Sequence, residues 1–525
     1  MSLGRINASA ATLTKNRTED SVVPISGLCA TCVDGCIGMC EVGKSAYRGA
    51  EVIYPQPFGI MTTAAEKEYP VDLSHFTILG SCRGAYGIEP DPDKATFPAV
   101  DTEQRIGHDK GIKVRMPIVI PGLGSTAIAK NNWEGLAIGA AISGIIVTIG
   151  ENVCGMDPGT KIKNGRVVSS PEMEMRVKLF QEWQDGYGAV VVQANVEDTR
   201  LGVHEYVIEK LGVEVVELKW GQGAKDIGGE VKIKDLKRAQ MLKDRGYIVL
   251  PDPYDPRIIK SFEQKMFHEF ERHSRIGMAE EESFYKQVEK LRKAGAKYIF
   301  LKTGAYRPRD LAFAVRLSSE AKIDLLTVDA AGGGTGMSPW RMMNEWGVPG
   351  IELWSLLYQY LNKLEKKGKY LPDCAIASGF TMEDQIFKGL SLGAPYFKLI
   401  GMARAPLTAA MVGKTIGKML QEGQEIVYVS RFGASKEEVF ITASELKQKY
   451  GKKFDSLPTG AIGLYTYIKR LEQGLRQIMC GSRKFALKYI TRDDIAAITP
   501  EASKISGIPY IMDIDKEEAE KILSF

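Results

Sequence analysis

The sequence predicts an α/β protein whose main body is a (β/α)8 TIM barrel, with a cysteine-rich N-terminal extension and a helical C-terminal extension. Three observations predict it. Short β-branched runs alternate with helix-period segments from residue 114 onward, the last strand-like runs end in glycine or another small residue, and four of the 8 cysteines cluster near the N-terminus. Strands that alternate with helices form parallel βαβ units, and one α/β barrel accommodates ~250 residues or more.

Three regions follow along the chain. Residues 1–110 hold a polar lead, the cysteine motif and a stretch rich in Pro, Gly and Asp that has little periodicity. Residues 111–405 carry the alternating runs, from VRMPIVI and WEGLAIGAAIS to MEDQIFKGLSLG and FKLIG, with YIVLPD and a helical stretch from about 260 to 294 between them. Residues 406–525 predict a helical extension that covers the barrel or forms an interface.

Composition restricts the classes of partner and the compartment. The 525 residues carry a net charge of only +4, which does not favour a nucleic-acid or membrane-surface partner. The polar N-terminus lacks a secretory apolar segment, and the apolar run at 136–149 is shorter than the ~20 residues that cross a bilayer. We therefore expect a cytoplasmic protein that acts with small molecules and other proteins, and we expect it to be a homo-oligomer.

The clustered cysteines predict a metal centre. Cys29, Cys32, Cys36 and Cys40 have the spacing C-x2-C-x3-C-x3-C, with glycines between them that let the backbone wrap a small inorganic core. Four thiolates can each bind one iron of an iron–sulfur cluster, most simply 4Fe-4S. A tetrahedral zinc site and a chance grouping remain alternatives.

Glycine-rich turns follow the late strand-like runs. VDAAGGGTGMSP, IASGFT and LIGMAR place small residues where backbone N–H groups can approach a ring or a phosphate. The ends of late barrel strands and the following helix N-termini form the phosphate site of this fold. Lys302 ends the run KYIFLK, and a cation there can stabilise the anionic part of a reduced flavin.

An earlier turn has a second possible meaning. GLGSTA at 122–127 matches the dinucleotide pattern G-x-G-x-x-A after a strand and before a helix. Glu151 lies in range to bind a ribose, but no convincing second strand end precedes it. A backbone strip against a flavin edge fits the turn better.

Several of these loops, in this order, resemble the FMN domain of glutamate synthases, particularly the archaeal-type synthase subunits without a glutaminase domain. The resemblance covers about residues 110–520. It rests on MPIVIPGLGSTAI, WEGLAIGAAISG, GENVCGMDP, VELKWGQGAKDIGGEV, IFLKTG, GGGTGMSP and the tail RKFALKYITRDDIAAITPEASKISGIPYI. The segment with QGAK and GG is the most specific of these matches.

The resemblance implies roles for particular residues. Lys219, Gln222 and Lys225 would hold an acidic 2-oxo or 2-imino dicarboxylate, and Lys302 would act beside the flavin. The residues implied to bind FMN are Gly122, Gly124, Ser125, Gln193, Lys302, Asp329, Gly333, Gly334, Thr335, Ser378, Gly379, Gly401, Met402 and Ala403.

The implied activity is an FMN-dependent oxidoreductase that reduces a 2-imino acid, most plausibly 2-iminoglutarate, to glutamate in nitrogen metabolism. Electrons would arrive through the iron–sulfur cluster from a ferredoxin or a separate NAD(P)H-oxidising subunit, and ammonia from solution or a separate glutaminase subunit. Two alternatives remain. One is an N-methylglutamate-synthase-like or other amine reaction on an acidic substrate, and the other is an electron-transfer subunit of a larger complex.

The sequence departs from the family in two places. The larger synthases bind a three-iron cluster through cysteines after the last flavin loop, where this chain reads ARAPLTAAMVGKTIGK. Two of the family's conserved loops are altered, to GENVCGMDP and SGFT. These changes leave the native substrate open.

Overall fold

A closed barrel of eight parallel strands forms the body of the protein, in a computed structural model that describes residues 34, 36, 42, 45, 46, 67, 69–221, 230–333, 338–425 and 429–525. The last strand of the barrel closes against the first, with Gly401 opposite Val119. The predicted TIM barrel is therefore confirmed, and an open dinucleotide-binding sheet is excluded. The barrel strands are β4 (Ile118–Leu123), β5 (Ile146–Ile149), β8 (Ala189–Ala194), β9 (Val215–Lys219), β13 (Tyr298–Thr303), β14 (Leu325–Asp329), β15 (Asp373–Ala377) and β16 (Phe397–Gly401).

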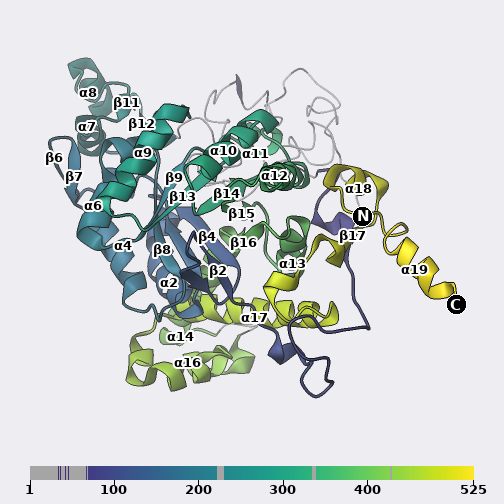
Figure 1. Cartoon of the computed structure of the whole chain (residues 1–525). Helices are drawn as coiled ribbons and strands as arrows, with labels where there is room; N and C mark the ends of the chain where they lie inside the picture. Colours follow the sequence, from purple (N-terminus) through teal and green to yellow (C-terminus); the bar gives the residue numbers. More distant parts are fainter. Residues whose placement is uncertain are drawn as a thin grey trace.

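Helices surround the barrel on its outside (Figure 1). The strands read as nearly continuous apolar runs because one face packs on these helices and the other faces the barrel interior. The principal covering helices are α2 (Ala127–Ser143), α4 (Pro171–Gln181), α6 (Val203–Leu211), α9 (Glu281–Ala294), α10 (Pro308–Glu320), α12 (Gly350–Glu365), α13 (Glu383–Leu392) and α14 (Arg404–Gln421). Shorter elements in the connections are α3 (Val153–Met156), β6 (Lys161–Lys163), β7 (Arg166–Ser169), α5 (Val196–Arg200) and α11 (Trp340–Glu345).

A hairpin blocks the N-terminal end of the barrel. It consists of β2 (Gln104–Ile106) and β3 (Ile112–Val114), which pair antiparallel just before the first barrel strand. The buried apolar side chains of this hairpin join one cluster with the inward-facing residues of the barrel strands. Any ligand of the barrel must therefore bind at the opposite end, where the strands reach their carboxyl termini.

An inserted antiparallel sheet interrupts the barrel pattern between β9 and α9. It has the order β10 (Glu230–Ile233), β12 (Phe270–His273), β11 (Ile248–Leu250), and it carries α7 (Leu236–Asp244) and α8 (Pro256–Glu263). The prediction that YIVLPD continues the parallel alternation is wrong, because this run forms β11. The continuous helix expected over about 260–294 is also wrong, since β12 separates α8 from α9.

The inserted sheet forms because its apolar side chains pack in a small core of their own. Phe262, Phe267 and Phe270 pack on one another with ring centroids 5.0–5.5 Å apart. They belong to a buried cluster distinct from the main core. The sequence analysis did not predict β12 because the run FERH is mostly charged. Of its four residues, only Phe270 and Arg272 are buried.

The C-terminal region packs directly on the barrel. Helix α17 (Thr459–Gly481) crosses α2 and α14. The helices approach so closely that a Cβ on Gly413 would lie 2.5 Å from the carbonyl oxygen of Thr459, and one on Gly135 would lie 3.1 Å from Cα of Gly460. Glycine is therefore needed at Gly413, and a side chain at Gly135 would require a small shift of the neighbouring helix.

A strand of the N-terminal extension and a strand of the C-terminal tail form a small sheet. Strand β1 (Phe76–Ile78) pairs antiparallel with β17 (Ile495–Ala497), so the N-terminal extension and the tail stabilise each other. The last helix projects from the body (Figure 1). The remaining helices of this region are α15 (Lys436–Val439), α16 (Ala443–Tyr450), α18 (Pro500–Ser506) and α19 (Lys516–Leu523).

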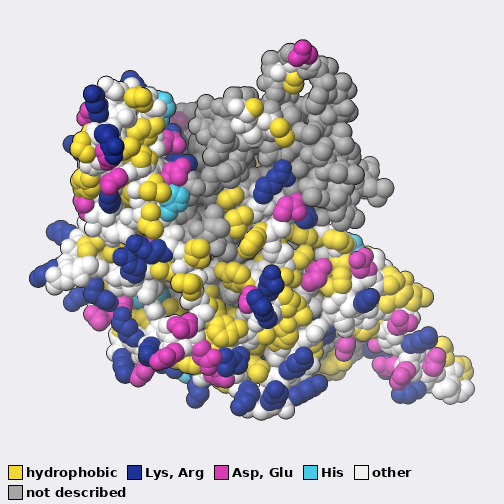
Figure 2. All heavy atoms as spheres, turned by 90° about the horizontal axis from the view of Figure 1, so that it is seen from above, with side chains coloured by type: hydrophobic (Ala, Val, Ile, Leu, Met, Phe, Trp, Pro, Cys, Tyr) yellow, Lys and Arg dark blue, Asp and Glu magenta, His cyan; other side chains and the backbone are white. Residues whose placement is uncertain are grey.

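Charged side chains of both signs are interspersed over the face seen in Figure 2. Among the described residues, no helix combines the length and the apolar character needed to span a bilayer.

Candidate functional site

The predicted residues of the late strands lie together at the carboxyl end of the barrel. Asp329 is opposite Ala377, Ala377 is opposite Gly401, and Lys302 is opposite Lys219 in the parallel registers. Because all eight strands run in the same direction, their ends share one side of the molecule. The strand-end turns therefore meet at one end of the barrel, which we call the mouth.

A polar layer on the inner face of the strands lines the mouth. Side chains alternate between faces along a strand, and Val215, Phe300 and Leu325 point into the barrel interior. Two residues further along each strand, the same face carries Glu217, Lys302 and Thr327. This layer also includes Gln193, whose Nε2 donates to Oε1 of Glu217 at 2.5 Å.

Lys302 and Asp329 form a buried ion pair in this layer. Nζ of Lys302 lies 3.1 Å from Oδ2 of Asp329, and each side chain is only 5% exposed. Burial acts to lower the pKa of Lys302, but the negative charges of Asp329 and Glu217 outweigh it, so the pKa is raised. Lys302 therefore keeps its positive charge, and it is not a solvated strand-end lysine.

Glu217 is an acid of the site that the sequence analysis missed. Burial raises its pKa, while the charge of Lys302 and the hydrogen bond from Gln193 oppose the shift. Its position was available from the sequence, because Glu217 precedes Lys219 by two residues in VELK and so shares its face. A carboxyl group with a raised pKa beside a mouth is suited to proton transfer.

Lys219 lies at the end of β9 and pairs with the loop after β5. Its Nζ is 2.6 Å from Oε1 of Glu151, and its side chain is 9% exposed, so it is not an ordinary surface lysine. Glu151 was considered only as a ribose ligand from the sequence, whereas the structure pairs it with Lys219. The other two predicted substrate residues, Gln222 and Lys225, lie outside the described residues.

The turn after β4 packs against neighbouring backbone and the polar layer. A Cβ on Gly122 would lie 2.8 Å from Oε1 of Gln193, and one on Gly124 would lie 2.5 Å from the carbonyl oxygen of Glu151. Glycine is therefore required at Gly124, where the neighbour is backbone, whereas a side chain at Gly122 would displace the amide of Gln193. Ser125 follows in the same turn, before α2.

Arg176, on α4, forms hydrogen bonds to the backbone of this turn. No pattern in the sequence indicated this role. Its Nη1 donates to the carbonyl oxygens of Leu123, at 3.3 Å, and Gly124, at 3.0 Å, and its Nη2 pairs with Glu172 at 2.7 Å. The guanidinium also lies over the ring of Trp133, 5.0 Å from the centroid. Arg176 therefore fixes the backbone at the end of β4 although it is fully buried.

The late turns present backbone groups to the mouth. Ser378 has φ 139°, which is strained for a non-glycine residue, and its hydroxyl donates to the carbonyl oxygen of Ala331 at 3.1 Å. Gly379 follows with φ 76°. A Cβ on Gly333 would lie 2.3 Å from Oδ1 of Asp329. Gly334 and Thr335 lie outside the described residues.

The end of the last strand leads directly into a long helix. Gly401 ends β16, the backbone N–H of Met402 donates to Val119 at 3.0 Å, and Ala403 is the N-cap residue of α14. Among the described residues, no side chain caps this helix. Its first N–H groups could therefore accept an anion, and they follow the strand next to β15, after which Ser378 and Gly379 come.

These residues fit an FMN. Oε1 of Gln193 is buried without a hydrogen-bond partner in the described part of the chain, and a flavin ring offers N–H donors. Lys302 supplies a cation for the reduced ring. For the phosphate, no described residue accepts a hydrogen bond from the backbone N–H groups of Gly379 and Ala403. The role of each residue in binding stays a prediction.

The predicted metal ligands cannot be placed. Cys29, Cys32 and Cys40 lie outside the described residues, and Cys36 is exposed. Within the described ranges no group of three or more His, Cys, Asp or Glu side chains could hold a metal ion. Of the cysteines outside the motif, Cys154 and Cys374 are buried, as small apolar residues commonly are, whereas Cys82 is exposed and Cys480 is partly exposed.

Comparison with known proteins identifies a conserved region. Residues 271–413 match the family model described as a conserved region in glutamate synthase. None of the curated protein sequences matches the chain.

Several solved structures match the chain at low similarity. A flavocytochrome b2 double mutant with pyruvate bound is 13% identical over 81% of this chain and 76% of that chain, with a TM-score of 0.45. A mandelate oxidase mutant with (S)-mandelic acid is 12% identical over 80% and 86%, with a TM-score of 0.43. A lactate oxidase of Pediococcus acidilactici is 11% identical over 81% and 84%, with a TM-score of 0.44. At these scores the likenesses carry no functional argument.

Proposed function

We propose that this chain, whose residues 271–413 match the conserved region of glutamate synthase, is an FMN-dependent oxidoreductase. It reduces a 2-imino acid, most simply 2-iminoglutarate, to glutamate. FMN supplies the hydride when it is bound at the mouth. The imine carbon accepts that hydride and the nitrogen accepts a proton. The observation that carries the proposal is the buried polar layer at the mouth, where Lys302 and Lys219 lie on adjacent strands.

The two lysines have different tasks in this proposal. Lys302 is held by Asp329 inside the barrel and faces the flavin. Lys219 is at the strand end, where a dicarboxylate from solution can reach it and displace part of its pairing with Glu151. Gln222 and Lys225 would complete the substrate site.

Glu217 is the group best suited to donate the proton that the imine nitrogen accepts. Its carboxyl is buried and its pKa is raised, so it can hold a proton at a higher pH than an exposed glutamate. It shares the inner face of β9 with Lys219, two residues closer to the barrel core.

We further propose that an iron–sulfur cluster on Cys29, Cys32, Cys36 and Cys40 supplies the electrons. Support comes from the place where the following chain attaches to the body. The backbone N–H of Lys67 donates to Oδ1 of Asn344 at 3.0 Å, and its Nζ lies 2.7 Å from Oε2 of Glu345. Both partners are on α11, which follows the loop after β14 on the mouth side.

The experiment is product analysis with the purified protein under anaerobic conditions. Reduced enzyme, 2-oxoglutarate and ¹⁵N-labelled ammonium are expected to give labelled glutamate, and Lys219→Met should abolish most of this product. Methylammonium in place of ammonium tests the N-methylglutamate alternative. If neither amine gives an amino acid while FMN is bound and reducible, the proposed reaction is wrong and an electron-transfer role is favoured.

A further inference from the structure

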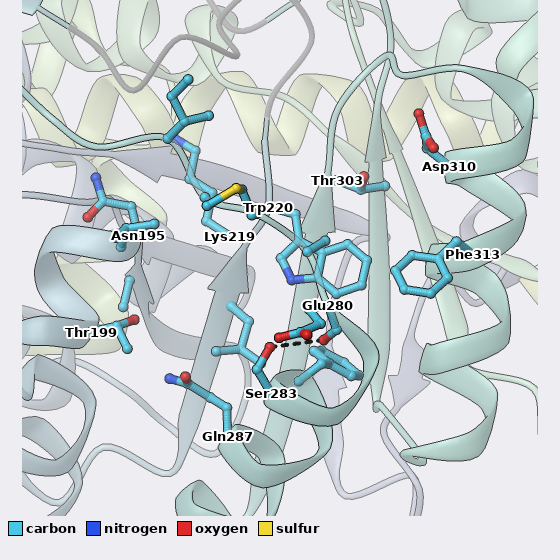
Figure 3. A pocket seen from close by; sticks show the side chains of 18 of the residues that line it. Asn195, Thr199, Lys219, Trp220, Glu280, Ser283, Gln287, Thr303, Asp310 and Phe313 are labelled. Atoms are coloured by element: carbon cyan, nitrogen blue, oxygen red, sulfur yellow. Dashed lines mark hydrogen bonds between the residues drawn. The ribbon is translucent and has the colours of Figure 1, made fainter.

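The loop after β5 carries an acid that pairs with a lysine of the mouth. Glu151 lies two residues beyond the end of β5, and its Oε1 is 2.6 Å from Nζ of Lys219. Lys219 also lines a cavity of about 510 Å³ beside the mouth, which Figure 3 shows from close by. A carboxylate that enters this cavity therefore competes with Glu151 for the ammonium group.

The residue after Glu151 has an unusual backbone. Asn152 has φ 65°, in the left-handed region that few non-glycine residues adopt. It is the N-cap residue of the short helix α3, where an asparagine side chain commonly accepts a hydrogen bond from the helix, but here the side chain makes no capping bond. Other contacts must therefore hold this backbone in place.

Two buried groups hold Asn152. Its backbone N–H donates to Oδ2 of Asp198, on α5, at 2.8 Å, and its side-chain Oδ1 accepts from the hydroxyl of Tyr247 at 3.3 Å. Asp198 is 1% exposed and Tyr247 is 4% exposed. Breaking a buried hydrogen bond is costly because the groups left behind have neither a partner nor water. The backbone beside Glu151 is therefore fixed by α5 on one side and by the inserted sheet on the other.

Tyr247 is itself held by the inserted sheet. It directly precedes β11 and belongs to the buried cluster of that sheet, which also includes Met156 of α3. The guanidinium of Arg272, on β12, lies over its ring, 5.0 Å from the centroid. A Cβ on Gly155 would overlap its hydroxyl, so α3 approaches this tyrosine too closely for a side chain there. Tyr247 therefore transmits the position of the inserted sheet to the loop after β5.

A second residue of the inserted region holds the same loop further along the chain. Arg245 is the C-cap residue of α7, and its Nη1 donates to the carbonyl oxygens of Gly155, at 2.7 Å, and Asp157, at 2.8 Å. Its Nη2 donates to the carbonyl oxygen of Thr160 at 3.1 Å. One guanidinium therefore fixes the backbone at three points, which the ammonium group of a lysine cannot reproduce.

We propose that Tyr247 is a positioning residue for Lys219: through Asn152 it holds Glu151 against the lysine, so the inserted sheet sets how readily an acidic ligand reaches the mouth. Arg245 acts in the same direction on the rest of the loop. The sheet that interrupts the barrel pattern then has a task at the proposed substrate site.

The nature of the acidic ligand rests on the proposed function, whereas the pair of Glu151 and Lys219 is present without any substrate. The lysine itself can therefore report on its position. A failure of glutamate formation would not alter that result, and an unaltered lysine would not contradict the proposed reaction.

The test is acetylation of the purified full-length protein by acetic anhydride, followed by peptide mass spectrometry. The rate at Lys219 is divided by the rate at Lys286, whose side chain on α9 is 71% exposed. Tyr247→Phe removes only the hydroxyl and should raise this ratio by about two- to fivefold, the effect of one lost hydrogen bond. Arg245→Lys should raise the ratio as well, through different contacts.

Tyr254→Phe is the matched control. It removes a hydroxyl of the same inserted region, one that donates to Asp244 at 2.8 Å and does not contact the loop after β5. The ratio should stay unchanged in this variant. Circular dichroism before labelling shows which variants are folded, and Arg245→Lys provides the same test if Tyr247→Phe is not.

A double-variant cycle separates positioning from general loosening. Glu151→Gln removes the charge that pairs with Lys219, so adding Tyr247→Phe to it should have little further effect on the ratio. A second increase in that background would overturn the proposal. So would an unchanged ratio in folded Tyr247→Phe, or an equal rise in Tyr254→Phe.

Discussion

Nζ of Lys302 lies 3.1 Å from Oδ2 of Asp329 inside the barrel, with both side chains 5% exposed. The pair joins two adjacent strands, β13 and β14, immediately below the mouth. A buried charge without its partner is costly, whereas a complete pair roughly offsets its own desolvation. The pair therefore makes a prediction about stability that does not depend on any ligand.

Lys302→Met should destabilise the fold by about 3–5 kcal/mol, because Asp329 is left buried and unpaired. The double variant Lys302→Met with Asp329→Asn should recover most of that loss. Urea unfolding monitored by circular dichroism measures both. Lys243→Met is the control, since its pair with Asp252 is exposed and should contribute little to stability. Equal losses in the Lys302 and Lys243 variants would contradict the assigned burial.

Asp198 should make stability depend on pH. It is fully buried beside Asn152, and burial raises its pKa from 3.8 to about 7. The unfolded carboxyl ionises near its ordinary pKa, so between about pH 4 and pH 7 the folded state holds a proton that the unfolded state releases. The contribution of Asp198 to the free energy of unfolding is therefore fully present below pH 4 and is lost as the pH rises through 7. The loss amounts to roughly 4 kcal/mol in all.

Asp198→Asn stays neutral throughout this range. Its unfolding free energy relative to the native protein should rise from pH 4 to pH 7 and then level off. Urea unfolding at half-unit pH steps checks this. Asp252→Asn is the control, because the pKa of the exposed Asp252 is lowered and its contribution should be constant above pH 4. A constant difference between Asp198→Asn and the native protein would show that Asp198 does not titrate in this window.

Gly124 tests whether the turn after β4 must approach its neighbour closely. A Cβ there would lie 2.5 Å from the carbonyl oxygen of Glu151, which is backbone and cannot move aside alone. Gly124→Ala should lower the free energy of unfolding by about 1–3 kcal/mol and reduce the FMN content of the purified protein. Gly481→Ala, where a Cβ would meet nothing within 4 Å, should do neither. Full FMN content in Gly124→Ala would remove this turn from the cofactor site.

The sequence predicted the barrel because buried parallel strands are nearly continuous apolar runs, and it predicted the mouth because strand-end glycines are needed for close backbone contact. It did not reveal the inserted sheet, whose strands are short and partly charged. Glu217 could have been found from its spacing to Lys219. Arg176 could not, since its partners are carbonyl groups of Leu123 and Gly124, far away in the chain.

Arg176 should be a positioning residue for the mouth. Arg176→Lys retains the charge but cannot reach two carbonyl oxygens and Glu172 together, so the turn after β4 should loosen. We expect a loss of about 2 kcal/mol in stability and a weaker affinity for FMN, measured by fluorescence titration at a temperature where the variant is folded. Glu172→Gln is the matched control, because it removes the ion pair and leaves both carbonyl contacts. Equal FMN affinity in the two variants would assign Arg176 a structural role only.

Lys67 should influence how fast electrons reach the flavin, if the cysteine segment that precedes it in the chain delivers them. Lys67→Met and Glu345→Gln each break the 2.7 Å contact with α11, and a partly exposed pair contributes up to about 1 kcal/mol. Flavin reduction by a reduced ferredoxin should therefore slow by roughly two- to fivefold in stopped-flow absorbance, while direct reduction by dithionite stays unchanged. Lys94→Met, which breaks an exposed pair with Glu89, should leave both rates unaltered. Unchanged ferredoxin rates in the Lys67 and Glu345 variants would mean that this attachment does not guide the electron path.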